Sequence, residues 1–391
     1  MGAMRTHVLV AAVGSIALLG AVSAARGQGL QAIEASASAR RSAAVVVEDL
    51  PLVYAAQVLP FDGAGAGERW PLAEQTRRAV ERLLAVLAEA GSEPARLVKV
   101  NLYVARGDDG EAALRALAAE LPAGAQPAVS LVQTALAHPQ ALVAIDAVAV
   151  AGEKLAAMDE VRRTRAAALL PRGSRLFVSG QAEPGMLREA TRKTLESLSA
   201  TLRHCGRADR DVVQVKCFLQ PMTAVREVQE ELARYYGNEQ TPPAVFVEWR
   251  STAPIEIELV AYAGPAAGPR VEYLTPPAMK ASPVFSRVAR VAGGRVVFFS
   301  DLFGPPEASP DAQLEAAFEN LNKLAERAGT DLKHLVKATY YVTDGEISRA
   351  HNAIRPRYYD PQRPPAASKA EVAGTGRPGV RYVMDMIGAV P

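Results

Sequence analysis

Few residues in this chain of 391 amino acids have the type and setting to carry chemistry. The most conspicuous are two carboxylates, Glu256 and Glu258, which flank Ile257 inside an alternating run that reads as a β-strand. An acidic group in such a strand loses hydration, so it must bond to neighbouring backbone or to a basic partner. These carboxylates are therefore candidates for either a structural anchor or a functional group.

Two cysteines, Cys205 and Cys217, could carry redox chemistry. Cys205 ends an expected helix, and strand alternation places Cys217 on the face that this helix covers. The sequence leaves two alternatives open. One is a disulfide, which an exported chain would permit, and the other is a pair of buried, reduced thiols.

Metal and nucleotide chemistry find no support in the sequence. The histidines show no metal-ligand spacing, and the chain has no Gly-rich phosphate loop or nucleophile elbow. We therefore expect no metal and no cofactor. The net charge is +2 with acidic and basic residues interspersed, so we expect no nucleic-acid partner.

The elements that must position these groups are clearest in the middle of the chain, over residues 176–263. A short apolar strand is followed by a helix with Leu195, Leu198 and Leu202 on one face, which stops at Gly206. An alternating strand, a second helical pattern and two closing strands complete the unit. The pattern predicts β–α–β–α–β–β, enough for one compact core.

The same unit occurs three times. The glycine that ends the first helix precedes the next strand by seven residues in each copy (91 to 98, 206 to 213, 329 to 336). The offset from that strand to a Pro-Ala pair is 29, 30 and 29 residues. Such internal repetition is a strong fold signal. We therefore expect an α+β protein of three tandem repeats, at 41–152, 161–264 and 272–391.

The motifs of the middle copy resemble those of the YjgF/RidA (L-PSP) family. They are Ser-Gly-Gln at 179–181, a helix ending in Gly, Val-Lys, Pro-Ala, and Ile-Glu-Ile-Glu at 255–258. The resemblance covers nearly the whole mature chain, once per repeat. It implies a chorismate-mutase-like fold in which ligand pockets lie between neighbouring subunits of a trimer. Three joined copies would then form a monomeric pseudo-trimer with three non-identical pockets, because short linkers make the assembly intramolecular.

The resemblance also implies where a site should be. In active family members an arginine directly follows Pro-Ala and binds the carboxylate of a 2-imino acid through paired hydrogen bonds. The equivalents here are Val129, Val245 and Ala367, none of them charged. Two steps further along each strand lie Leu131, Val247 and Lys369. Lys369 is therefore the candidate replacement cation, and a solvated strand lysine is the alternative.

By the same resemblance, Glu256 is the glutamate that holds the hydrolytic water, and Ala144 and Val383 replace it in the other copies. The second acidic position persists in every copy, which we interpret as structural. Gln181 closes an opening strand, as a ligand contact or a turn residue. One further aromatic per copy lines a pocket or packs the interface. The candidate catalytic residues are Glu256 and Lys369, and the candidate ligand-binding residues are Gln181, Val129, Leu131, Val245, Val247, Ala367, Tyr103, Phe218 and Tyr341.

The first 40 residues should lie outside the repeats. Arg5 precedes an apolar run from Val8 to Val22, and small residues follow it, which is typical of a secretory signal peptide over 1–25. An uncleaved anchor is the alternative. Residues 26–40, rich in Ala, Ser and Gly, should be a linker. We expect the chain to be exported, to the periplasm or beyond.

Two functions are compatible with these features. We favour a binding protein for a small, rather apolar ligand, because the usual arginine is missing and the expected pocket lining is apolar. The alternative is an imine or enamine deaminase that hydrolyses 2-imino acids to 2-keto acids with relocated residues. A structural scaffold is a third possibility.

Overall fold

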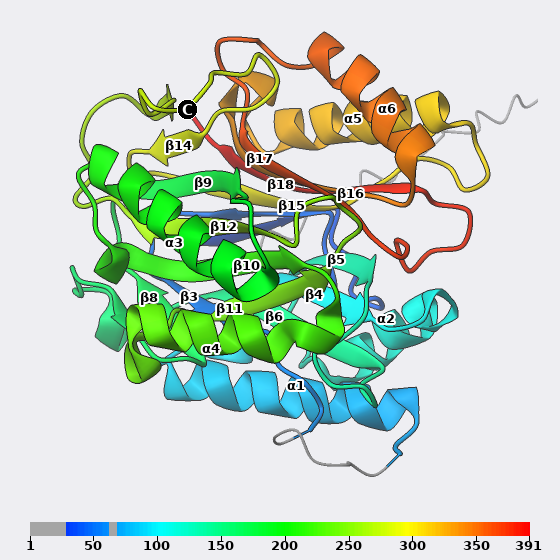
Figure 1. Cartoon of the computed structure of the whole chain (residues 1–391). Helices are drawn as coiled ribbons and strands as arrows, with labels where there is room; N and C mark the ends of the chain where they lie inside the picture. Colours follow the sequence, from blue (N-terminus) through cyan, green and yellow to red (C-terminus); the bar gives the residue numbers. More distant parts are fainter. Residues whose placement is uncertain (1–28, 62–68) are drawn as a thin grey trace, which may run out of the picture.

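The computed structural model describes residues 29–61 and 69–391 (Figure 1). The expected signal peptide at 1–25 lies outside these described residues. No helix within them is long and apolar enough to cross a membrane.

The three repeats fold as expected, each with two helices and the strands that these cover. The first contains β3 Leu52–Ala55, α1 Leu72–Glu89, β4 Leu97–Val104, α2 Gly110–Glu120, β5 Ala128–Gln133 and β6 Val143–Val150. The second contains β9 Arg175–Gln181, α3 Leu187–His204, β10 Val212–Leu219, α4 Val225–Tyr236, β11 Ala244–Glu248 and β12 Ile255–Tyr262. The third contains β15 Val296–Leu302, α5 Pro310–Arg327, β16 Leu335–Val342, α6 Gly345–Ile354, β17 Ala366–Glu371 and β18 Tyr382–Ala389.

The glycines that set the repeat spacing do so for a conformational reason. Gly91, Gly206 and Gly329 follow the long helices of their repeats with φ of 77°, 69° and 75°. This left-handed conformation ends a helix and carries no Cβ penalty in glycine. The chain then enters the central strand of the repeat after the same number of residues each time.

Short hairpins between the repeats complete the sheets in a cyclic way. The strands are β1 Leu30–Ile33, β2 Ala44–Val47, β7 Arg162–Arg163, β8 Ala167–Leu170, β13 Val271–Leu274 and β14 Val288–Val291. The sheet orders are β5-β4-β6-β3-β8-β7, β11-β10-β12-β9-β14-β13 and β1-β2-β15-β18-β16-β17. Each hairpin therefore joins the sheet of the repeat before it, and the N-terminal hairpin joins the sheet of the last repeat.

This arrangement corrects one expectation and sharpens another. Residues 26–40 are not simply a linker, because Leu30–Ile33 forms β1 and pairs antiparallel with β2. Composition suggested a linker, but a short strand needs only a few alternating residues and a partner that lies far away in sequence. Likewise the hairpin at 162–170 follows the first repeat in space, although the sequence groups it with the second.

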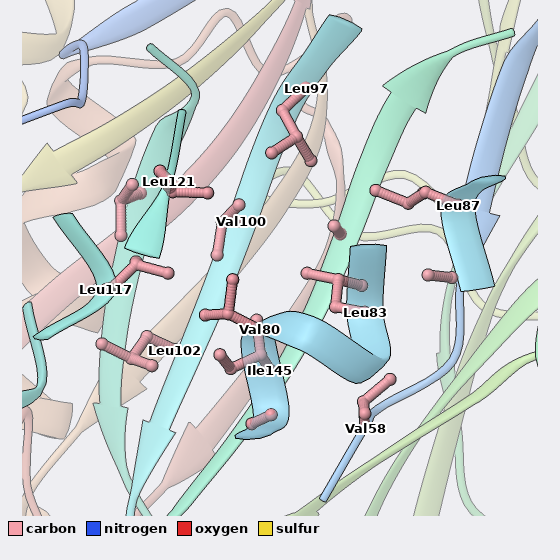
Figure 2. Packing of buried hydrophobic residues seen from close by; sticks show 14 of the residues in the cluster. Val58, Val80, Leu83, Leu87, Leu97, Val100, Leu102, Leu117, Leu121 and Ile145 are labelled. Carbon is pink, nitrogen blue, oxygen red and sulfur yellow. The ribbon is translucent and has the colours of Figure 1, made fainter. Parts of the chain in front are cut away.

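Apolar side chains form two kinds of core. Each repeat buries one face of its sheet against its own helices, as in the first repeat, where α1 and α2 cover β4 and β6 (Figure 2). The opposite faces of the three sheets meet in the middle of the molecule, where strands from every repeat contribute to one shared core. The helices therefore lie on the outside and the sheets enclose a common axis (Figure 1).

Both cysteines are free thiols in the structure. Cys217 is fully buried in the helix-facing core of the second repeat, and Cys205 packs against the same core. Burial raises the pKa of the Cys217 thiol. Of the two alternatives left open by the sequence, the structure contains the reduced pair.

Candidate functional site

A ring of buried charges occupies the centre of the molecule. Lys99 Nζ lies 2.7 Å from Asp385, and Lys337 Nζ lies 2.6 Å from Glu258. Each pair joins two different repeats. The side chains surround a small cavity of about 50 Å³. Charges this deep are stable only when they are paired and hydrogen-bonded, so the ring requires all three repeats to be in place.

The second repeat contributes its lysine to the ring from a different strand position. By register, Gln214 stands where the other repeats carry Lys99 and Lys337, since all three lie opposite an apolar residue of the closing strand. The cation appears two residues later as Lys216, whose Nζ donates to the Tyr341 hydroxyl at 3.4 Å and which is electrostatically coupled to Glu258, Asp385 and Asp146. Asp146 also accepts hydrogen bonds from Asn101 and Tyr103. The expectation that the second acidic position of each repeat is structural, with a basic partner, is confirmed for Glu258 and Asp385.

Five of the predicted ligand-binding residues lie together beside this ring, but in a closed cluster. They are Tyr103, Phe218, Val245, Val247 and Tyr341, and each is at most 1% exposed. Tyr103 donates a hydrogen bond of 2.7 Å to Asp146. Of the two interpretations given to the aromatics, interface packing describes them, because they leave no surface to a ligand.

The other apolar candidates face the helices. Val129 and Leu131 are buried in the core under α1 and α2, and Ala367 packs against the corresponding core of the third repeat. The expectation that Val129, Val245 and Ala367 are equivalent is wrong by one residue. Asn101, Lys216 and Thr339 occupy equivalent positions in the three repeats. On the neighbouring parallel strands, Asn101 is aligned with Ser130 and Thr339 with Ser368, whereas Lys216 is aligned with Val245. A one-residue shift in register moves a side chain to the opposite face of the sheet, and the offset of 30 in the middle copy was its only sign.

Glu256 lies at the junction between the second and third repeats. Gly180 of β9 makes room for it, since a Cβ at that position would lie 2.0 Å from Glu256 Oε1. The Gly180 amide donates to Ser368 Oγ of β17 at 3.1 Å, and Ser368 is also hydrogen-bonded to the Glu256 carboxyl. One serine from the third repeat thus holds the carboxylate and the turn of the second.

At the junction between the first and second repeats, a side chain fills the place that corresponds to Glu256. By register Gln57 corresponds to Gly180, and Ala144 corresponds to Glu256. The Gln57 side chain crosses to β11, where Nε2 donates to the Phe246 carbonyl at 3.1 Å. An amide that pairs with backbone has therefore replaced the glycine and carboxylate combination.

The electrostatic setting of Glu256 is unusual for a glutamate. Burial raises its pKa to about 7, and the nearby Glu258 adds to this, while Ser368, Lys337 and Arg287 act in the opposite direction. Arg287 is half-buried, stacks on the Phe285 ring and donates to the Lys280 carbonyl. Arg287 is not among the residues predicted from the sequence, because it lies outside the family motifs, in the segment leading into β14.

Lys369 does not join Glu256. Its Nζ donates to Asn352 Oδ1 at 3.0 Å and lies 3.5 Å from the Ser348 carbonyl, both on α6. Ser368 contacts Glu256, and successive strand residues point to opposite faces. Lys369 and Glu256 are therefore on opposite faces of β17. Burial and the charge of Arg355 lower the pKa of Lys369 to about 8. The ammonium group of Lys369 therefore lies against a helix and loses its proton more readily than an ordinary lysine.

Gln181 also faces a helix. It lies opposite Ile257 in the register, the place of Val58 and Leu302 in the other repeats. Its Nε2 donates to Thr201 Oγ1 on α3 at 2.8 Å. Gln181 therefore ties the opening strand to its own helix, and is neither a turn residue bonded to its own backbone nor part of the junction.

The raised pKa of Glu256 should make the stability of the protein depend on pH. Because the folded state holds this proton more tightly than the unfolded chain, the stabilisation is complete below about pH 4.5 and is lost as the pH rises through about 7. Relative to Glu256→Gln, the wild-type free energy of unfolding should fall by on the order of 2–3 kcal/mol over this range. Urea unfolding of both proteins at several pH values measures it. A constant difference would mean that Glu256 titrates normally.

The junction between the second and third repeats thus combines a carboxyl group that titrates near neutrality, a hydroxyl and a nearby guanidinium. Such a group can accept a proton from water and return it within one reaction. Among the described residues, no cluster of His, Cys, Asp or Glu side chains is arranged to hold a metal ion.

Comparison with known proteins identifies the class. The sequence model of the family described as "Endoribonuclease L-PSP" matches at residues 32–151, 167–263 and 278–389. The chain therefore belongs to this family, in three tandem copies, and its α+β repeats are those that the family resemblance implied.

Individual relatives each match about one repeat. RutC family protein PH0854 of Pyrococcus horikoshii is 35% identical over 103 residues, 23% of this chain and 80% of its own. Protein DfrA of Myxococcus xanthus is 30% identical over 118 residues, 28% of this chain and 88% of its own. The structure of the Rid family protein YyfB of Yersinia pestis is 29% identical, covers 32% of this chain and 99% of its own, and has a TM-score of 0.28.

Proposed function

We propose that this protein hydrolyses a small imine or enamine, and that the chemistry is confined to the junction between its second and third repeats. The observation that supports this most directly is Glu256, whose pKa of about 7 allows it to act as both base and acid at neutral pH. The other junctions have Ala144 and Val383 at this position.

In the proposed reaction, ionised Glu256 removes a proton from water as the oxygen attacks the imine carbon. The protonated carboxyl then returns this proton to nitrogen, which gives a carbinolamine. A second transfer through the same carboxylate moves the hydroxyl proton of the carbinolamine to nitrogen, so that ammonia leaves and a carbonyl compound remains. Ser368 orients the carboxylate through its hydrogen bond. Arg287 supplies positive charge near the junction, since the third repeat has no arginine directly after Pro-Ala.

A ligand-binding protein without turnover is the second candidate. Its support came from the apolar residues after Pro-Ala, and these are buried in closed cores rather than exposed to a pocket. We therefore rank hydrolysis above binding alone. If the chain is exported, as residues 1–25 suggest, its substrate would be an imine formed outside the cytoplasm.

The test is imine hydrolysis in vitro with 2-imino acids generated in situ by an amino-acid oxidase. Glu256→Gln should lower the rate by roughly 100-fold or more, because it removes the proton acceptor. Ser368→Ala should give a smaller loss and shift the pH profile, since it removes a bond that lowers the pKa of Glu256.

The control is Glu230→Gln, which changes an exposed glutamate of the same repeat and should leave the rate unchanged. No acceleration by folded wild-type protein over a range of imines would exclude the proposed activity for those substrates and favour binding alone. Equal rates for wild type and Glu256→Gln would place the chemistry elsewhere.

A further inference from the structure

A lysine occupies a core position in the third repeat. By strand register, Lys369 of β17 stands at the position of Leu131 in the first repeat and of Phe246 in the second. Both apolar side chains are buried in the cores that lie under the helices of their own repeats. Lys369 is half-buried at this place. Its amine therefore loses part of the hydration that an ordinary surface lysine keeps.

One face of α6 lies against this amine. Lys369 Nζ donates to Asn352 Oδ1 at 3.0 Å and lies 3.5 Å from the Ser348 carbonyl, and Arg355 follows directly after the helix. Positions 348, 352 and 355 are separated by four and three residues, which places them along one face of a helix. Both acceptors are neutral, so they favour the ammonium form of Lys369 less than a carboxylate would.

The charged groups around Lys369 do not form an ion pair with it. Burial and the charge of Arg355 act against the ammonium form, and Glu371 of β17 acts in its favour from further away. Glu371 is paired instead with Arg250, at 3.7 Å. His351 of α6 is buried, and burial holds its pKa well below the usual value, so this imidazole is neutral at neutral pH.

An amine in this setting can react with carbonyl carbons. A lysine that is desolvated and close to another cation is deprotonated more often at neutral pH, and the neutral amine is the nucleophile. Its nitrogen forms a bond to the carbonyl carbon, and water carries a proton from nitrogen to oxygen to give a carbinolamine. Loss of water then leaves an imine. One aldehyde and one neutral amine give one imine and one water, so no oxidant or reductant is needed.

We propose that Lys369 binds small, neutral aldehydes covalently as an imine. A small ligand is expected because Asn352 and Ser348 lie directly against the amine. A neutral ligand is expected because Arg355 and Glu371 place opposite charges near it. The site is independent of hydrolysis at the second junction, since Lys369 lies on the other face of β17 from the residue that contacts Glu256.

Reductive alkylation of the full chain with propanal and sodium cyanoborohydride, followed by peptide mass spectrometry, tests this proposal. All lysines compete in one sample, so the exposed Lys154 and Lys323 serve as internal references. At about pH 7.5, Lys369 should be labelled roughly tenfold faster than either reference, because a larger fraction of its amine is neutral. The ratio should fall towards one above about pH 10.5, where the other lysines are also deprotonated.

Three variants test the role of the surroundings. Asn352→Asp places a carboxylate against the amine and should slow the labelling of Lys369 by roughly tenfold, since an ion pair favours the ammonium form. Arg355→Gln removes the neighbouring cation and should slow it by about threefold. Arg357→Gln is the matched control, because it removes an exposed arginine that is paired with Glu315, and the rate should stay within about twofold of wild type.

The proposal is overturned if Lys369 in folded wild-type protein is labelled no faster than Lys154. It is also overturned if Asn352→Asp and Arg355→Gln, with native circular dichroism, are labelled like wild type. An adduct that survives dialysis without the reductant would contradict an imine, which water hydrolyses. Labelling does not depend on turnover at Glu256, so a failure here is distinct from a failure of the hydrolysis assay.

Discussion

Replacing Lys337 with methionine should destabilise the protein by about 3–5 kcal/mol, because it leaves Glu258 buried without its cation. The two groups are 2.6 Å apart, and their side chains are only 9% and 3% exposed. Lys337 belongs to the third repeat and Glu258 to the second. Loss of this ion pair should therefore destabilise the assembly of the repeats and not one repeat alone. Urea unfolding measures the change.

Two further variants separate charge burial from packing. The double variant Lys337→Met/Glu258→Leu removes both charges and should regain most of the stability, since an apolar pair of similar size can replace a buried ion pair. Lys193→Met breaks an exposed pair of 2.7 Å on α3 and should cost less than about 1 kcal/mol. If Lys337→Met were no more harmful than Lys193→Met, the ring would have to be well hydrated, which would contradict its burial.

Removal of the N-terminal hairpin is the second change with a large expected effect. A chain that begins after Val47 lacks β1 and β2, so β15 becomes an exposed edge of the third sheet. Unpaired strand edges associate with other chains, and β2 also buries apolar residues in two cores. We expect soluble or insoluble oligomers in place of the single-chain particle that we propose for the protein.

Light scattering coupled to size exclusion distinguishes the outcomes. A chain that begins at Gly29 is the control, because it keeps every described strand, and it should have the mass of one chain. A monomeric, fully folded product of the longer deletion would mean that the third sheet is stable without the hairpin. A trimer of control chains would contradict the single-chain pseudo-trimer.

The sequence predicted the architecture well because its signals are local and repeated. The glycine that ends the long helix of each repeat and the alternation that follows it depend on backbone conformation and burial, which a short window reveals. It did not reveal that each hairpin joins the preceding sheet, since strand pairing over hundreds of residues leaves no periodicity in the chain.

The site was only partly predictable for a different reason. Glu256 was found through its motif, whereas Ser368 and Arg287 were missed because they come from other segments and meet it only in three dimensions. The apolar candidates proved not to be equivalent, because one extra residue before β11 turns Val245 and Val247 towards the axis, whereas Val129, Leu131 and Ala367 face the helices. Lys369 was assigned to a face that its neighbour Ser368 occupies.

The pairing of the first hairpin with the last repeat has a consequence for biosynthesis. Leu30 is aligned with Val47, Val47 with Val296, and Val296 with Ala389, so the two ends of the described chain lie in one sheet, where β2 and β15 separate β1 from β18. A ribosome delivers these strands first and last. The N-terminal hairpin must therefore wait for its partner strand β15 until the third repeat is synthesised, and the sheet cannot be completed before β18 appears. Order of synthesis and order of assembly are thus separated, which leaves the nascent polypeptide open to chaperones or a translocation channel until its final strand appears.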